Sequence, residues 1–183
     1  MKEKICDANK YLFYRKSLDN VLSEINFDQI ELLANEIYSR MDGKSEIHIL
    51  GNGGSAANAH HVVGDYLKTF SLLKKNIRIT CLSDNTCYLT AAANDLDYSQ
   101  IYESLVGSRI MKEDLIIYFS GSGNSMNLVK SAMLAKKMKI KTASITGYDG
   151  GALKNLTSIP IHAPIQDMEI AEDIQLIIMH YLK

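Results

Sequence analysis

The stretch that decides the fold is EIHILGNGGSAANAHHVVGD, residues 46–65. It begins with a short apolar run, passes through a glycine-rich turn and continues as a segment with helical character. Glycines in a turn after a strand let the backbone approach a ligand closely. The helix also carries His61 and, four residues later, Asp65. Side chains of these types can polarise a ligand or exchange a proton. The stretch predicts a strand, a ligand-binding turn and a helix with reactive side chains.

Four further short, apolar, β-rich runs follow, each bounded by Gly, Ser, Asp or Pro: 76–83, 114–120, 141–147 and 158–164. Helical segments are expected at 55–70, 85–108, 124–138 and 167–182. Strands that alternate with helices predict an α/β fold, a three-layer sandwich in which helices cover both faces of a five-stranded parallel sheet. Ligands bind such sheets at the carboxyl ends of the strands, where the turns at 51–55 and 120–125 are both expected.

Two amphipathic helices, predicted at 2–22 and 27–42, precede this alternation. The second carries apolar residues at helical spacing: Ile30, Leu33, Ile37 and Met41. Such a pair either covers a face of the sheet or builds an oligomer interface, and the pattern alone supports both interpretations equally.

Composition narrows the class of protein. The chain has 183 residues, 46% of them hydrophobic, and a net charge of -1, so it has no overall basic field for nucleic acid or an anionic membrane. Its three cysteines (Cys6, Cys81 and Cys87) have no CxxC spacing, which fits a reducing cytosol. The first residues lack the apolar core of a signal peptide, and no apolar run approaches the roughly 20 residues of a membrane span. We therefore expect a soluble cytoplasmic protein.

The second turn lies in FSGSGNSMNLVKSA, residues 119–132. A helix N-terminus favours an anion, glycines admit it to the backbone, and the hydroxyls of Ser120, Ser122 and Ser125 add neutral donors. The turn has no lysine and is not a nucleoside triphosphate loop. A serine-capped helix is the ordinary interpretation of one such turn. Two in one small sheet instead predict a site for a single phosphate monoester.

The sequence disfavours two other kinds of site. Gly51, Gly53 and Ala56 match G-x-G-x-x-A, and Asp84 could serve as the ribose-binding acid of a dinucleotide site. That glycine pattern is common, however, and would leave the second turn without a role. Ser122 lacks the G-x-S-x-G arrangement, so a hydrolase nucleophile is not expected.

A metal site is one interpretation of two helical pairs. His61 and Asp65 differ by about 40° in direction on their helix, and Glu172 and His180 by about 80° on the last one. Together they could form an N2O2 site for zinc or another divalent ion. Spacing alone favours the plainer view that these are solvated acids and an ordinary helix histidine. Nothing in the pattern assigns chemistry to His48, His60 or His162.

Four ordered motifs carry a resemblance to a known family. They are GNGGSAANAHH (51–61), CLSDNTCYLTAAANDLDY (81–98), FSGSGNSMNLVKSA (119–132) and AEDIQLIIMHYL (171–182). In combination they resemble the sugar isomerase (SIS) domain family, and within it the phosphoheptose isomerases, from about residue 10 to the C-terminus.

The resemblance implies one SIS domain over residues 1–183, flavodoxin-like, with 1–43 as a helical extension that packs on the sheet and in the oligomer. It also implies a homotetramer with active sites at subunit interfaces. The family's substrate-binding segments fall on Asn52, Gly53, Gly54, Ser55, Asn94, Asp95, Ser120, Gly121, Ser122 and Ser125. The family's zinc ligands fall on His61, Asp65, Glu172 and His180, one Zn²⁺ per subunit.

The implied reaction interconverts sedoheptulose 7-phosphate and D-glycero-D-manno-heptose 7-phosphate through an enediol. It is the first step toward nucleotide-activated heptose for lipopolysaccharide or capsule. Asp65, helped or replaced by Glu172, would carry the proton between the two carbons, and His180 would serve as acid and base at the oxygens. The alternatives are an isomerase of another sugar phosphate, or a non-catalytic sensor or adaptor. A sensor or adaptor would not need His61, Asp65, Glu172 and His180 together.

Two residues depart from the family pattern. Asp65 stands where the family has glutamate, and its shorter side chain reduces its reach. Glu172 stands where the family has glutamine, and it adds a negative charge.

Overall fold

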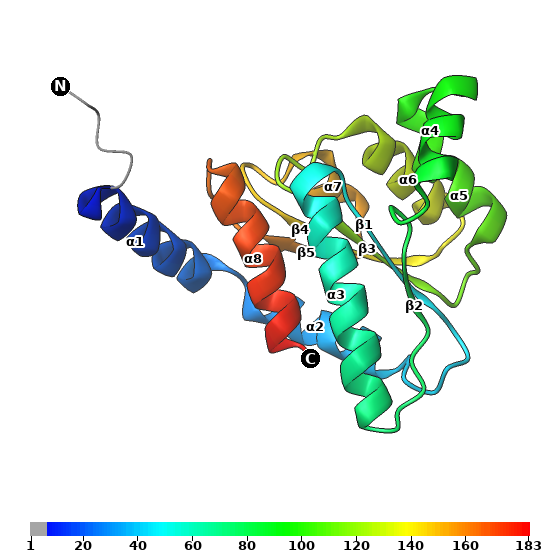
Figure 1. The fold of residues 1–183 in the computed structure, drawn as a ribbon, viewed down its shortest axis with the longest axis horizontal. Coiled ribbons are helices and arrows are strands. Elements are labelled where there is room, and N and C mark those ends of the chain that lie inside the picture. Colours follow the sequence, from blue (N-terminus) through cyan, green and yellow to red (C-terminus); the bar gives the residue numbers. More distant parts are fainter. Residues whose placement is uncertain (1–6) are drawn as a thin grey trace.

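The computed structural model describes residues 7–183 and contains one five-stranded sheet (Figure 1). The strands are β1 (Ile47–Leu50), β2 (Ile79–Cys81), β3 (Leu115–Ser120), β4 (Lys141–Thr146) and β5 (Ile159–His162). They are all parallel, in the order β2-β1-β3-β4-β5. The α/β class and the five predicted strands are confirmed, although β2 is shorter than the predicted run of 76–83.

The helices surround this sheet. They are α1 (Ala8–Glu24), α2 (Phe27–Tyr38), α3 (Gly53–Leu72), α4 (Thr86–Asp95), α5 (Ile101–Arg109), α6 (Met126–Lys137), α7 (Gly151–Leu156) and α8 (Met168–Tyr181), with a 3-10 turn, η1 (Tyr98–Gln100). The start of the predicted helix 2–22, like Cys6, lies outside the described residues. No helix in the described part of the chain is both long and apolar enough to cross a membrane.

Two helix predictions were wrong. The segment 85–108 is not one helix, because the chain leaves helical geometry at Leu96 and is extended at Asp97, where φ is 179°. The Asp97 carboxylate accepts a hydrogen bond from the Ser99 N–H and so begins η1 instead of continuing α4. The second error is α7, which was not predicted because six residues are too few to show a helical period.

The two faces of the sheet hold separate cores, as alternation along a strand requires. In β3, Leu115, Ile117 and Phe119 belong to one core, and Ile116 and Tyr118 to the other. The first core also contains buried residues of α2, α3 and α8, and the second contains those of α4, α5, α6 and α7. The predicted three-layer arrangement is therefore present.

The two leading helices differ in their role. In α2, Leu33 and Ile37 are buried in the first core, so this helix covers the sheet. In α1 only Val21 is buried, and Figure 1 shows the helix extending away from the rest of the fold. Tyr14 of α1 still contacts α8, where its hydroxyl donates to the Asp173 carboxylate at 2.6 Å.

His48, in the middle of β1, has a structural role. It is buried, with Nδ1 3.0 Å from the Thr80 hydroxyl and Nε2 3.4 Å from the Asp114 carboxylate. Burial lowers the pKa of His48, which favours its neutral form. The residue links β1 to β2 and to the turn before β3.

Candidate active site

A pocket of about 300 Å³ lies at the carboxyl ends of β1 and β3. Its lining consists of Asn52, Gly53, Gly54, Ser55, Phe119, Ser120, Gly121, Ser122, Ser125, Leu128, Met168 and Glu172. The two glycine- and serine-rich turns, 70 residues apart in the sequence, therefore form one pocket, as the sequence predicted. Phe119, Leu128 and Met168 were not predicted there, since apolar residues in a buried strand and in helices give no separate signal.

The two helices that begin at this pocket have no side-chain cap. In α1, α2, α4 and α8 an Asp or Asn at the N-cap accepts a hydrogen bond from an N–H of the first turn. At α3 and α6, as also at α5 and α7, the N-cap residue makes no such bond. The free N–H groups and the positive ends of the α3 and α6 dipoles therefore face a site that suits an anion.

Two glycines of the first turn are needed for different reasons. Gly53 has φ +55°, a left-handed conformation that other residues rarely adopt. Gly54 leaves space for the Glu172 carboxylate, which a Cβ at this position would displace. One glycine shapes the turn and the other admits the α8 carboxylate.

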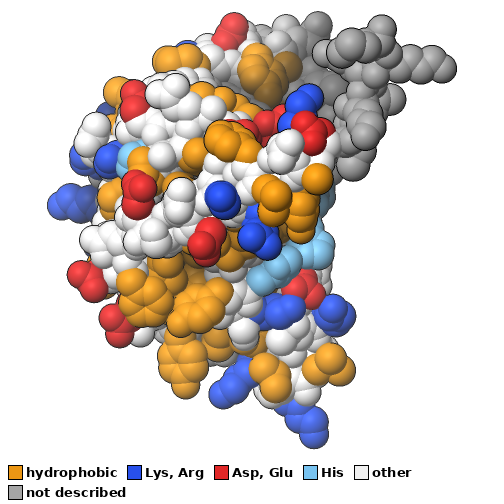
Figure 2. All heavy atoms as spheres, turned by 90° about the vertical axis from the view of Figure 1, so that its left-hand side faces the viewer, with side chains coloured by type: hydrophobic (Ala, Val, Ile, Leu, Met, Phe, Trp, Pro, Cys, Tyr) orange, Lys and Arg blue, Asp and Glu red, His pale blue; other side chains and the backbone are white. Residues whose placement is uncertain are grey.

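A second group of polar side chains lies further along α3 and α8. His61, Asp65 and His180 each offer one ligand atom, and these atoms lie within 4.8 Å of one another. The two Nε2 atoms are 3.0 Å apart, and His180 Nε2 is 3.9 Å from Asp65 Oδ2. Both histidines are exposed, and Figure 2 shows histidines beside acidic and basic side chains on the surface. Two imidazoles and one carboxylate form a donor set that fits a zinc-type ion and leaves a position for substrate.

Glu172 is not part of this group of three, so its role as a fourth ligand stays a prediction. It precedes His180 by eight residues, about 12 Å along a helix axis. Its carboxylate lies at the pocket instead, where Oε1 accepts from the Ser55 hydroxyl at 3.4 Å. The spacing argument correctly paired His61 with Asp65, but it could not place Glu172 relative to α3.

Two lysines surround the Asp65 carboxylate. Lys183 hydrogen-bonds one oxygen, and Lys68 Nζ lies 2.9 Å from the other. The bond from Lys183, followed by that from Lys68, holds the pKa of Asp65 well below its ordinary value. Asp65 is therefore ionised at neutral pH, the form that can bind a cation.

Asn94 and Asp95 are not brought to the pocket. They end α4, are exposed, and bond to each other, with Asn94 Nδ2 donating to Asp95 Oδ1 at 2.8 Å. Tyr98, which follows them, does reach the first turn: its hydroxyl donates to Asn52 Oδ1 at 3.1 Å. No signal in the sequence distinguished Tyr98 from its neighbours.

Comparisons with known proteins agree with this arrangement. The SIS domain family matches residues 13–147. The chain therefore belongs to the SIS-domain family. Within that family it is similar to phosphoheptose isomerases: the one from Helicobacter pylori (strain Shi470) is 33% identical over 167 residues, which cover 91% of this chain and 84% of that protein. The family resemblance drawn from the motifs is confirmed.

Solved structures show the same fold. A phosphoheptose isomerase from Francisella tularensis has a TM-score of 0.87 at 22% identity, covering 95% of this chain and 93% of that one. The Vibrio vulnificus NanR protein complexed with ManNAc-6P has a TM-score of 0.71 at 17% identity, covering 99% of this chain and 61% of that one. At these identities the likeness concerns the fold alone.

The contact between Gly54 and Glu172 generates a prediction. In Gly54→Ala the new methyl group pushes the flexible Glu172 side chain into the pocket, so we expect at least about tenfold weaker binding of inorganic phosphate, with little loss of stability. A ³¹P NMR titration measures the binding, and thermal unfolding measures the stability.

The matched control is Gly64→Ala, on the same helix, where a Cβ would meet no atom within 4 Å. This variant should bind phosphate like the wild type. Equal phosphate affinity in Gly54→Ala and the wild type would contradict the assignment of the pocket.

Proposed function

We propose that this chain is an aldose–ketose isomerase that interconverts sedoheptulose 7-phosphate and D-glycero-D-manno-heptose 7-phosphate. The observation that carries the proposal is the pairing of an uncapped, glycine- and serine-lined pocket with the His61–Asp65–His180 group along the same two helices. From Gly53 to His61 the rise along α3 is about 12 Å, comparable to an extended heptose with its phosphate. The names of the relatives support the same assignment.

The phosphate binds at the pocket. The N–H groups at the starts of α3 and α6 and the hydroxyls of Ser55, Ser120, Ser122 and Ser125 are its donors. Glu172 lines the inner wall and accepts hydrogen bonds from sugar hydroxyls rather than contacting phosphate, because two anions would repel each other. Anchoring the remote phosphate positions the carbonyl end of the sugar, which is how binding energy lowers a chemical barrier.

The chemistry takes place at the other end. Asp65 removes a proton from C1 of the ketose and returns it to C2, while His180 moves a proton between the two oxygens, so an enediol forms and collapses to the aldose. His61, Asp65 and His180 would hold a zinc ion, whose Lewis acidity stabilises the negative charge that develops on those oxygens. The two imidazoles and the ionised carboxylate provide the donors that such an ion requires.

The proton transfer is tested by Asp65→Asn. The amide cannot accept the proton, so turnover of sedoheptulose 7-phosphate should fall by at least about 100-fold, within the range for loss of a general base. A coupled or NMR assay of aldose formation measures it, and circular dichroism checks the fold. Residual activity near the wild-type level would overturn the role of Asp65.

The metal site is tested by replacing adjacent histidines. His61→Ala removes one of three donors and should weaken zinc binding by an order of magnitude or more in a chelator competition assay. His60→Ala is the control, because the His60 ring bonds to the Ser83 carbonyl at 3.2 Å and lies outside the group. Equal zinc affinity in the two variants would contradict the proposed ligands.

The chain further assembles as a homotetramer with active sites at subunit interfaces. Tyr11 and Phe13 of α1 are 66% and 72% exposed, and Figure 2 shows groups of hydrophobic side chains on the face at that end of the molecule. A second copy could also bring Asn94 and Asp95 to the substrate. Light scattering should give a tetrameric mass for the wild type and a smaller one for Phe13→Asp, and a monomeric wild type would contradict the assembly.

The reaction belongs in the cytoplasm, as the first step toward nucleotide-activated heptose for surface polysaccharide. A phosphorylated sugar is retained in that compartment, and the proposed product keeps the phosphate.

A further inference from the structure

Two asparagine side chains connect the phosphate-binding turns. Asn52, at the N-cap of α3, donates through Nδ2 to Asn127 Oδ1, and Asn127, in the first turn of α6, donates through Nδ2 to Asn52 Oδ1, both at 2.9 Å. Asn127 is 1% exposed, whereas Tyr98, which also donates to Asn52 Oδ1, is 57% exposed. The Asn52 amide oxygen therefore accepts two hydrogen bonds, and neither comes from its own helix.

Other asparagines in this chain behave differently at the same helical position. Asn26 begins α2 and accepts from the Asp28 N–H at 2.9 Å, and Asn85 begins α4 and accepts from the Tyr88 N–H at 2.9 Å. Capping is the ordinary behaviour of asparagine at an N-cap. The backbone of Asn52, with φ -118° and ψ 151°, has the extended geometry common to N-cap residues. The Asn52 side chain therefore does not make the N-cap hydrogen bond that its position favours.

We propose that Asn127 is a positioning residue that keeps the N-terminus of α3 open for the substrate phosphate. By pairing with both polar atoms of the Asn52 amide, it prevents that amide oxygen from accepting the N–H groups of Gly54 and Ser55. The inference rests on the proposed function, because it takes the phosphate as the anion that these N–H groups bind. Asn127 acts through Asn52 and lies outside the residues that line the pocket.

The pair also fixes the distance between the two turns. Its members follow β1 and β3, which are neighbours in the sheet, and each lies in or next to a helix N-terminus that faces the pocket. The Asn127 oxygen additionally accepts from the Leu128 N–H at 2.9 Å, so the orientation of its amide is set by α6. The Asn127 amide, whose orientation is fixed by α6, therefore fixes the orientation of the Asn52 side chain in the other turn.

The experiment measures the binding of inorganic phosphate by ³¹P NMR titration of the full chain. In Asn127→Ala the Asn52 oxygen is free to cap α3 and compete with phosphate, so affinity should fall about five- to tenfold, the value of an N-cap bond. In the double variant Asn52→Ala/Asn127→Ala the competing oxygen is absent, so the affinity should be higher than in Asn127→Ala, while it stays below that of the wild type because Asn52 itself lines the pocket. A merely structural role for Asn127 would give the opposite result, because two substitutions at the pocket would weaken binding at least as much as one.

Two further variants keep the test decisive. Ser131→Ala removes another buried hydrogen bond of α6, the 2.9 Å bond from the Ser131 hydroxyl to Tyr118, and should leave phosphate binding unchanged. Tyr98→Phe removes one bond to Asn52 at an exposed position where folding is not at risk, and should weaken binding about two- to threefold. If Asn127→Ala does not fold, an unchanged affinity in Tyr98→Phe overturns the proposal.

Turnover of sedoheptulose 7-phosphate, measured on the same wild-type sample, separates the two proposals. The double variant could recover phosphate affinity while the wild-type chain shows no turnover of sedoheptulose 7-phosphate. That result would support the role of Asn127 and reject the isomerase. Wild-type turnover with no rescue would reject the role of Asn127 alone. A wild type that binds no phosphate would overturn the positioning role together with the anion site.

Discussion

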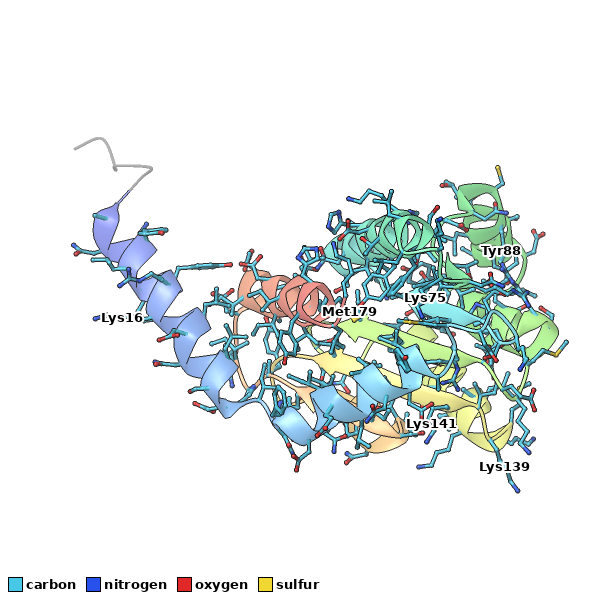
Figure 3. The ribbon with its side chains drawn as sticks, turned by 90° about the horizontal axis from the view of Figure 1, so that it is seen from below. Lys16, Lys75, Tyr88, Lys139, Lys141 and Met179 are labelled. Carbon is cyan, nitrogen blue, oxygen red and sulfur yellow. The ribbon has the colours of Figure 1, made fainter. Side chains whose placement is uncertain are left out.

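The site depends on the side-by-side packing of α3 and α8 on one face of the sheet. Figure 3 shows the two helices together on that face, where Met179 of α8 is labelled. Met179 belongs to the core that these helices cover. Polar bonds set their register: Asn58 Nδ2 donates to the Glu172 carbonyl at 2.9 Å and to Gln175 Oε1 at 3.0 Å, and Gln175 in turn donates to the Ser55 hydroxyl at 3.0 Å. Because Gln175 is fully buried, a shift of either helix would leave its amide unpaired, at a cost of about 1–3 kcal/mol.

This register gives the site two chemically different ends. One end is a turn-lined pocket whose donors are backbone N–H groups and serine hydroxyls, a set that suits negative charge without a positive side chain. The other end combines two histidines with an ionised carboxylate and so provides for positive charge and proton transfer. Local arrangement of this kind explains how a chain with a net charge of -1 can hold a phosphosugar.

Much of this could be predicted from the sequence, because it depends on local pattern. The alternation of β-rich and helical runs predicted the sheet, and the glycine and serine residues marked the two turns. The spacing of His61 and Asp65 placed them together because i and i+4 residues share a helix face. The break at Leu96 and Asp97 was missed because a single side-chain bond decides it.

Apart from the meeting of the two turns, contacts between side chains of distant segments could not be predicted. Glu172 lies at the pocket rather than beside His61 because the register of α3 and α8 is a tertiary property. The pairing of Asn52 with Asn127 depends on β1 and β3 being neighbours, which the chain order does not reveal.

The most direct measurement of the central claim is ¹³C NMR of the chain with sedoheptulose 7-phosphate in D2O, before and after treatment with EDTA. The account predicts an aldose anomeric signal with solvent deuterium at C2, its loss after EDTA and its return on addition of zinc. Unchanged ketose in the presence of zinc would contradict the assigned substrate. Aldose formation that is unaffected by EDTA would contradict the metal at His61, Asp65 and His180.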